Sequence, residues 1–186
     1  QIFLGLNPAL FGLAMTIPRI WDAFTDPVMG RISDRTQSRY GRRRPYVFVG
    51  ALAVALTFLT IWMVPQSMGD TGTFLWLTIG SVLFFTAFTV FSVPFNALVY
   101  EQTPDYHERT RLMFYLALFY NIGNLCVNWY VPATNWSGFE NPLVGARWIA
   151  LGLALVVFMG MGILPAIFGK ERFYDVAQKE NKDIGF

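Results

Sequence analysis

Five long apolar stretches follow one another along the chain, and short segments between them hold most of the charged residues. A helix needs about 20 mostly apolar residues to cross the hydrocarbon core of a bilayer. The stretches do not alternate between apolar and polar residues as barrel strands do, and they lack the polar face of a helix on a soluble core. The pattern predicts an all-α membrane protein with five transmembrane helices, over about residues 8–30, 46–64, 74–99, 112–131 and 148–168.

The basic residues lie almost entirely on one side of this arrangement. Of the 14 Lys and Arg residues, twelve fall in segments 31–44, 101–111 and 169–186. Cytoplasmic loops of membrane proteins carry an excess of Lys and Arg. We therefore expect these three segments in the cytoplasm and the loops around residues 69 and 137 on the outer side.

Composition excludes several other classes of protein. Hydrophobic residues make up 54% of the chain and charged residues only 14%, unlike a disordered chain, a coiled coil or a domain with a basic nucleic-acid-binding surface. The one cysteine, Cys126, and the one histidine, His107, exclude a disulfide within the chain and a metal site built from several such residues. We expect no cofactor, no metal beyond a Na⁺ ion, and no nucleic-acid partner.

The first apolar stretch contains three charged residues inside the expected span. Arg19, Asp22 and Asp26 are spaced three and four residues apart, so they share one face of a helix. At 1.5 Å per residue, Asp22 lies roughly 13 Å from the cytoplasmic end of the span, close to the middle of the bilayer. Ionisable groups at this depth are costly unless paired or hydrated, and they mark ion or substrate paths.

Two interpretations of this charged stripe stay open. In the first, Arg19 and Asp22 form an ion pair that only holds helices together, which leaves Asp26 unexplained because one arginine cannot neutralise two carboxylates. In the second, Arg19 offsets one charge while Asp22 and Asp26 bind a coupling cation, Na⁺ or a proton. Pro27 adds an oxygen to such a site, because its ring removes the hydrogen bond to the carbonyl of Ala23.

Two further stretches carry polar residues at the same helical spacing and at a similar depth. They are Thr89, Ser92 and Asn96 in the third stretch, and Asn121, Asn124 and Asn128 in the fourth. Any one of them can simply form a hydrogen bond between helices. Three polar stripes at one depth favour a solvated cavity near the midplane, as in secondary transporters.

Several motifs carry a family resemblance. Residues 22–27 read Asp-x-x-x-Asp-Pro, and they are followed by Ser33-Asp34-Arg35 and by a Gly-Arg-Arg-Arg-Pro segment at 41–45. Residues 94–98 and 103–109 extend the match. These motifs resemble the glycoside–pentoside–hexuronide:cation symporters of the major facilitator superfamily, the family of the melibiose carrier.

The resemblance covers nearly the whole chain and implies a domain organisation. Residues 1–169 correspond to helices two to six of a twelve-helix carrier, as a partial N-terminal bundle. Residues 170–186 are then a cytoplasmic segment towards the central loop. We expect the first helix and the C-terminal six-helix bundle to belong to the same protein and to lie outside this chain.

The resemblance also implies roles for individual residues. The two motif carboxylates of the family bind the coupling cation, which carries over to Asp22 and Asp26, with Thr89 as a neighbouring ligand. The family's sugar site matches Ser92, Asn96 and Ala117, and all three differ from its aspartate, tryptophan and arginine. The residues that resemble the superfamily's cytoplasmic gating motif are Gly30, Asp34, Arg35, Gly41, Arg42, Arg43 and Arg44.

The sequence thus predicts a secondary transporter and not an enzyme. We expect Na⁺- or H⁺-coupled symport of a sugar, glycoside or related organic solute by alternating access, in a bacterial inner membrane. A lipid or lysolipid carrier on the same fold is an alternative. A Mg²⁺-dependent intramembrane transferase is a remote one, because it needs several carboxylates near the cytoplasmic interface, whereas Asp22 and Asp26 are deep and few.

Overall fold

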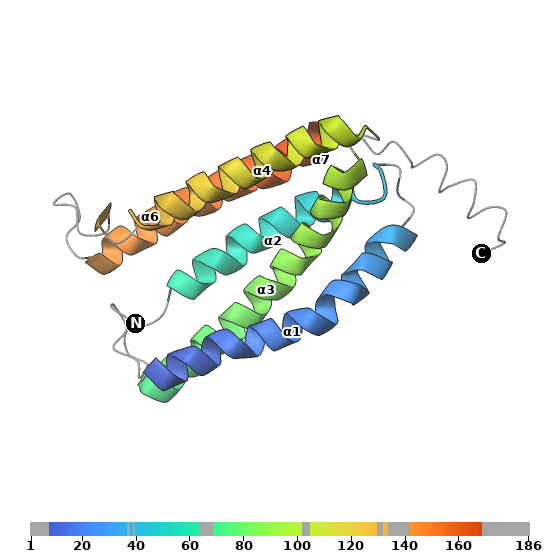
Figure 1. Ribbon diagram of the computed structural model, residues 1–186. Helices are drawn as coiled ribbons and strands as arrows, with labels where there is room; N and C mark the ends of the chain where they lie inside the picture. The colour runs from blue at the N-terminus through green and yellow to red at the C-terminus, as the bar shows by residue number, and fades with distance from the viewer. Residues whose placement is uncertain are drawn as a thin grey trace.

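The computed structural model describes residues 8–36, 38, 40–63, 69–101, 105–129, 132–133 and 142–168. These residues form long helices and contain no strand, which confirms the prediction of an all-α fold (Figure 1). The helices are α1 (Pro8–Arg35), α2 (Arg44–Trp62), α3 (Asp70–Glu101), α4 (Tyr106–Val127), α6 (Pro142–Val157), a π-helical segment (Phe158–Ile163) and α7 (Leu164–Phe168).

Each apolar stretch is helical over most of its predicted length, with shifted ends. α1 continues through Pro18 and Pro27 and on to Arg35, beyond the predicted end at residue 30. The last helix begins at Pro142, earlier than the predicted start at residue 148. Proline suits the first turn of a helix because its missing N–H has no partner there in any case.

Length and apolarity alone mark two helices as candidate membrane spans. They are Arg44–Trp62 and Thr71–Glu101, and Val144–Val156 is a shorter apolar segment. α1 and α4 are less apolar because, besides the charged stripe and the asparagines, α1 ends and α4 begins with several charged residues. The five-span topology and the cytoplasmic side of the basic segments stay predictions.

α3 lies between α1 and α2 and packs along both of them, and α2 also packs against α6, the π-helical segment and α7. The main apolar cluster forms where α2 meets α3, around Val47, Ala51, Val54, Ala87 and Phe91. Figure 1 shows α1 and α4 on opposite sides of the α2–α3 pair, and α4 packs closely on none of the other described helices. The packing thus fixes α1 against α3, and this contact positions the charged stripe.

The contact between α2 and α3 depends on Gly50. A Cβ added at this position would lie 2.6 Å from the backbone nitrogen of Phe91 and 2.7 Å from its Cα, which is closer than real Cβ atoms approach. Small residues in membrane helices allow the backbones to come this close. A side chain at position 50 would therefore push the two helices apart.

Gly50→Ala is expected to lower the melting temperature of the purified protein in detergent. Overpacking of this kind costs about 1–3 kcal/mol, because the backbone of Phe91 cannot move away without moving α3. Gly152→Ala in α6 is the matched control, since a Cβ there would meet no described atom within 4 Å. Equal melting temperatures for the two variants would contradict the close approach of α2 and α3.

Candidate cation site

Two carboxylates of α1 and one hydroxyl of α3 lie together, and all three belong to residues that the sequence singles out. Thr89 Oγ1 donates to Asp26 Oδ1 at 2.9 Å and to Asp22 Oδ1 at 3.2 Å. A hydroxyl has one proton, so it cannot make a full hydrogen bond to both carboxylates at once. The arrangement therefore brings three oxygen atoms from two helices together and leaves negative charge for a further positive group.

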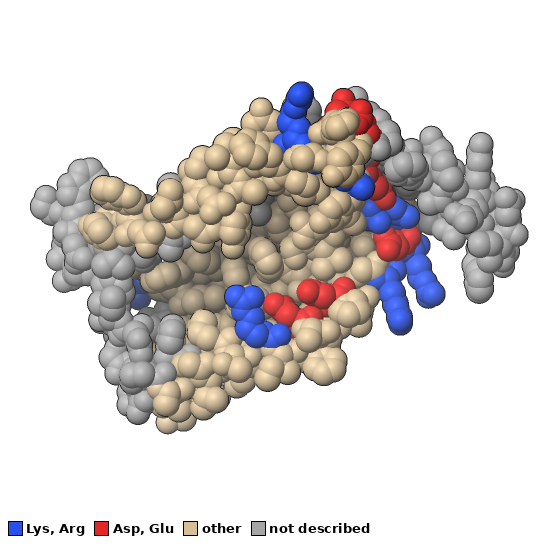
Figure 2. Space-filling model, in the orientation of Figure 1, with Lys and Arg blue, Asp and Glu red and all other residues tan. Residues whose placement is uncertain are grey.

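The three side chains differ in how far they are exposed to solvent. Thr89 is buried between α1 and α3 at 2% exposure, Asp22 is half-buried and Asp26 is exposed. Figure 2 shows basic and acidic side chains meeting on the α1 side of a hollow whose wall opposite them is mostly uncharged. The cluster is thus anchored by its buried threonine and open to solvent at Asp26.

Arg19 contacts an aromatic ring of α3. Its guanidinium carbon lies 4.7 Å from the centroid of the Phe85 ring. The ion pairs of the described residues do not include one between Arg19 and Asp22. Arg19 thus makes a cation–π contact with the neighbouring helix, while its charge still acts on Asp22 from beyond ion-pair distance, and both interpretations of the stripe stay open.

The other polar residues of the expected cavity take no part in this cluster. Ser92 is half-buried and Asn96 is exposed on α3. The asparagines of α4 and of the turn after it are exposed, and each side chain donates to the carbonyl four residues earlier, at 2.8 Å for Asn121, 2.9 Å for Asn124 and 3.4 Å for Asn128. No described hydrogen bond joins these five residues to the two carboxylates, so a cavity shared by the three helices stays a prediction.

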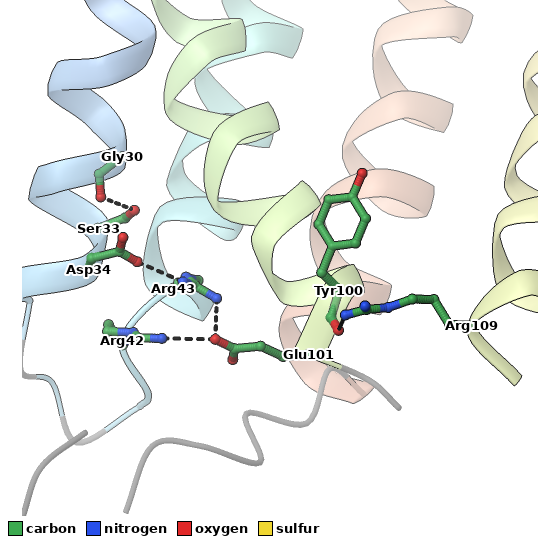
Figure 3. Close-up of polar contacts among 8 residues, drawn as sticks. All are labelled: Gly30, Ser33, Asp34, Arg42, Arg43, Tyr100, Glu101 and Arg109. Atoms are coloured by element: carbon green, nitrogen blue, oxygen red, sulfur yellow. Dashed lines mark hydrogen bonds and ion pairs between the residues drawn. The ribbon is translucent and has the colours of Figure 1, made fainter. Parts of the chain in front are cut away.

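A second polar cluster joins the ends of three helices at the basic segment (Figure 3). Arg43 donates to Asp34 of α1 at 2.6 Å and also to Glu101 at the end of α3. Arg42 donates to the same Glu101 oxygen at 2.9 Å. The side chains of Arg42, Arg43 and Glu101 are only 16%, 10% and 14% exposed, so these ion pairs are largely shielded from water.

Sequence reasoning missed Glu101. The sequence feature that could have identified it is an acidic residue directly after a long uncharged stretch, on the same predicted side of the membrane as the arginine-rich segment. Such a residue is usually solvated, and only the packing of α2 on α3 brings it to Arg42 and Arg43. Glu101 is therefore a structural partner of the predicted gating motif.

The remaining residues of that motif shape the same end of the molecule. Gly41 has a φ of 105°, a conformation that favours glycine, and its N–H bonds to the carbonyl of Ser38. Arg44 donates to the carbonyl of Ile167 at 2.7 Å, near the end of α7. Gly30 accepts a hydrogen bond from Ser33, and Arg35 lies in the last turn of α1, where a cation is favourable. Three successive arginines, 42–44, just before and at the start of α2, thus bind groups of α3, α1 and α7.

Comparison with known proteins agrees with this geometry. Residues 2–184 match the family described as MFS/sugar transport protein. An uncharacterized symporter of Synechocystis is 37% identical over 113 residues (58% of this chain and 21% of the relative), and a sodium-dependent lysophosphatidylcholine symporter 1-A of Danio rerio is 35% identical over 114 residues (59% and 21%). A candidate glycoside/cation symporter of Escherichia coli is 27% identical over 158 residues (83% and 34%).

The chain spans about a fifth to a third of the length of these relatives. The family match covers nearly the whole chain, and its helices, its charged stripe and its basic segment all fall within the matched residues. The resemblance to cation symporters of the major facilitator superfamily is thereby confirmed. The chain belongs to the MFS/sugar transport protein family, and its helices form part of a major facilitator fold.

Proposed function

We propose that this chain is part of a membrane carrier that couples the movement of a cation to the movement of an organic solute. The observation that carries the proposal is the convergence of Asp22, Asp26 and Thr89 inside a predicted membrane span. The names of the relatives support it, since all three are symporters. Two carboxylates with only a structural role would not need to face the hollow.

The geometry suggests how cation binding affects the helices. The bonded oxygens of Asp22 and Asp26 are at most about 6 Å apart, because both contact one hydroxyl, and two negative charges at that distance repel each other strongly away from water. A Na⁺ ion or a proton between them removes the repulsion and lets α1 and α3 close around the site. Binding of the cation then changes which side chains of α1 face a solute in the hollow.

The ion-paired cluster at the basic segment suits the cytoplasmic gate of this carrier. In the proposed cycle, Arg42, Arg43 and Glu101 hold the ends of α2 and α3 together while the site opens to the outer side. The rest of the carrier, a first helix and a second six-helix bundle, completes the cavity and rocks against this bundle. The carrier lies in a cytoplasmic membrane with its basic segments inward.

The substrate class we favour is a sugar or glycoside, which the family description and the Escherichia coli relative support. A lysophospholipid is the second candidate, and a specific feature favours it. A wholly apolar cavity of about 240 Å³ lies between α2, α3 and α6, with Phe58, Phe84 and Phe88 among its walls. Such a cavity suits an acyl chain, and the Danio rerio relative is named for a lysolipid.

The test is uptake by the whole carrier in proteoliposomes under an imposed ion gradient. We expect labelled p-nitrophenyl glucoside, or labelled lysophosphatidylcholine if the second candidate holds, to accumulate above equilibrium under an inward Na⁺ or proton gradient. An ionophore that dissipates the driving gradient should return the level to equilibrium. Uptake that reaches the same level with and without either gradient would contradict cation coupling, and liposomes without carrier are the control.

A further inference from the structure

The geometry of the cation site depends on how α1 is rotated against α3. The site takes its oxygens from both helices, and the Thr89 hydroxyl lies 3.2 Å from Asp22 Oδ1 and 2.9 Å from Asp26 Oδ1. Successive side chains of an α-helix point about 100° apart. A rotation of α1 by even part of that angle would carry the two carboxylates away from the hydroxyl.

Two contacts next to the site join the same two helices. Trp21 Nε1 donates to Thr86 Oγ1 at 3.0 Å, and the Arg19 guanidinium lies 4.7 Å from the centroid of the Phe85 ring. Trp21 directly precedes the first carboxylate of the site, and Thr86 is three residues before the hydroxyl of the site. Both contacts therefore lie within about a turn of the site, roughly 5–6 Å along the helix axes.

These contacts lie on opposite flanks of the interface between α1 and α3. The helical repeat puts Trp21 about 100° to one side of Asp22 and Arg19 about 60° to the other side. On α3, the same repeat puts their partners Thr86 and Phe85 on opposite sides of the hydroxyl of the site. A contact on each flank opposes rotation in one direction, so the pair of contacts fixes the rotation of α1.

The hydrogen bond between Trp21 and Thr86 is the more directional of the two contacts. The Thr86 hydroxyl donates its proton to the carbonyl of Val82 at 2.7 Å, which leaves its lone pairs for the indole N–H of Trp21. A cation–π contact tolerates a wider range of positions, out to about 6 Å from the ring centroid. Because Trp21 is 46% exposed, this bond fixes its side chain more than packing does.

We propose, building on the cation-coupled carrier above, that Trp21 and Thr86 are positioning residues for Na⁺ binding. Their hydrogen bond keeps α1 turned so that both carboxylates meet the Thr89 hydroxyl. Like other hard cations, Na⁺ needs several oxygen ligands at once, so its affinity depends on oxygens that two helices hold together in advance. Loss of the bond should raise the Na⁺ dissociation constant about 3- to 10-fold, which is the contribution of one neutral hydrogen bond.

The experiment measures Na⁺ binding to the whole purified carrier without any solute. NaCl is titrated calorimetrically into the carrier, with choline chloride keeping the ionic strength constant. Trp21→Phe removes the N–H and keeps an aromatic ring, and Thr86→Val removes the hydroxyl at nearly the same volume. Each change should raise the Na⁺ dissociation constant about 3- to 10-fold, and the double variant should raise it no further, because both changes remove the same bond.

Thr86→Ser keeps the hydroxyl and should bind Na⁺ like the parent. Trp76→Phe is the matched control, because Trp76 Nε1 donates to the carbonyl of Thr60 at 3.2 Å and so joins α3 to α2 by the same kind of bond. It should leave the Na⁺ dissociation constant unchanged, even where it lowers the melting temperature as much as Trp21→Phe does. Asp26→Asn should remove the calorimetric signal, which assigns that signal to this site.

Three results would overturn the inference. They are a parent carrier that binds no Na⁺, unchanged dissociation constants in Trp21→Phe and Thr86→Val, and an equal rise in Trp76→Phe, which would show only a general loosening of the bundle. Should Thr86→Val fail to fold, Trp21→Phe and Thr86→Ser decide the question. Solute uptake driven by a proton gradient in a carrier without Na⁺ binding would keep the proposed symport and reject only this role.

Discussion

Asp26→Asn is expected to abolish accumulation of substrate against its gradient and to leave exchange of substrate across the membrane. Asparagine has nearly the same size and can still meet the Thr89 hydroxyl, so α1 should stay packed on α3. The cation site, however, loses one of its two negative charges and with it most of the attraction for Na⁺ or a proton. We expect the accumulation ratio in proteoliposomes to fall from well above one to about one, because exchange alone cannot concentrate a solute.

Asp22→Asn should give the same loss of accumulation, since Asp22 shares the hydroxyl of Thr89 with Asp26. Glu108→Gln is the control, because Glu108 is an exposed carboxylate in the first turn of α4. Accumulation equal to the parent in both variants, with the same ion dependence, would contradict the cation site. Failure of both variants to reach the membrane, or a large fall of their melting temperatures, would show that the carboxylates serve the structure.

Glu101→Gln is expected to destabilise the carrier strongly. The change leaves Arg42 and Arg43 without the carboxylate that both of them share, in a place where their side chains are 16% and 10% exposed. Removal of one partner from a buried ion pair costs up to about 3–5 kcal/mol, because a charge stays behind where water scarcely reaches, and the remaining bond of Arg43 to Asp34 offsets only part of this loss. We expect a clearly lower melting temperature and easier proteolysis at the basic segment.

Asp34→Asn is the matched control for this prediction. Asp34 also pairs with Arg43, but its side chain is 54% exposed, so water can replace the ion pair. Exposed pairs contribute about 0–1 kcal/mol. Melting temperatures that fall equally in Asp34→Asn and Glu101→Gln would show that burial at the end of α3 does not determine the strength of this cluster.

The contact of Thr89 with Asp22 and Asp26 is the part of the structure that sequence reasoning anticipated best. Asp22 and Asp26 share a helix face because of their four-residue spacing, and counting residues from the charged helix ends put Thr89 at the depth of Asp22. These two arguments need only the geometry of single helices and the thickness of a bilayer. The structure does bring the three oxygens together, although the binding of a cation there stays a proposal.

Other features depended on how the helices rotate and approach each other. Spacing alone puts Arg19 on the face of Asp22, but it does not show that Phe85 of the neighbouring helix lies within reach. Glu101 becomes a largely shielded partner of two arginines because α2 packs along α3, with Gly50 against Phe91. The π-helical segment Phe158–Ile163 likewise has no signature in its apolar sequence.

The sequence by itself determined that the chain is helical, which residues are apolar enough for a membrane, and which charges share a face. These properties follow from transfer free energy and helix periodicity, which act within one segment. The tertiary structure alone decided which acidic side chain pairs with which arginine, and that the Arg19 guanidinium lies over the ring of Phe85. Those outcomes depend on side-chain packing between helices, where a rotation of one helix changes every partner.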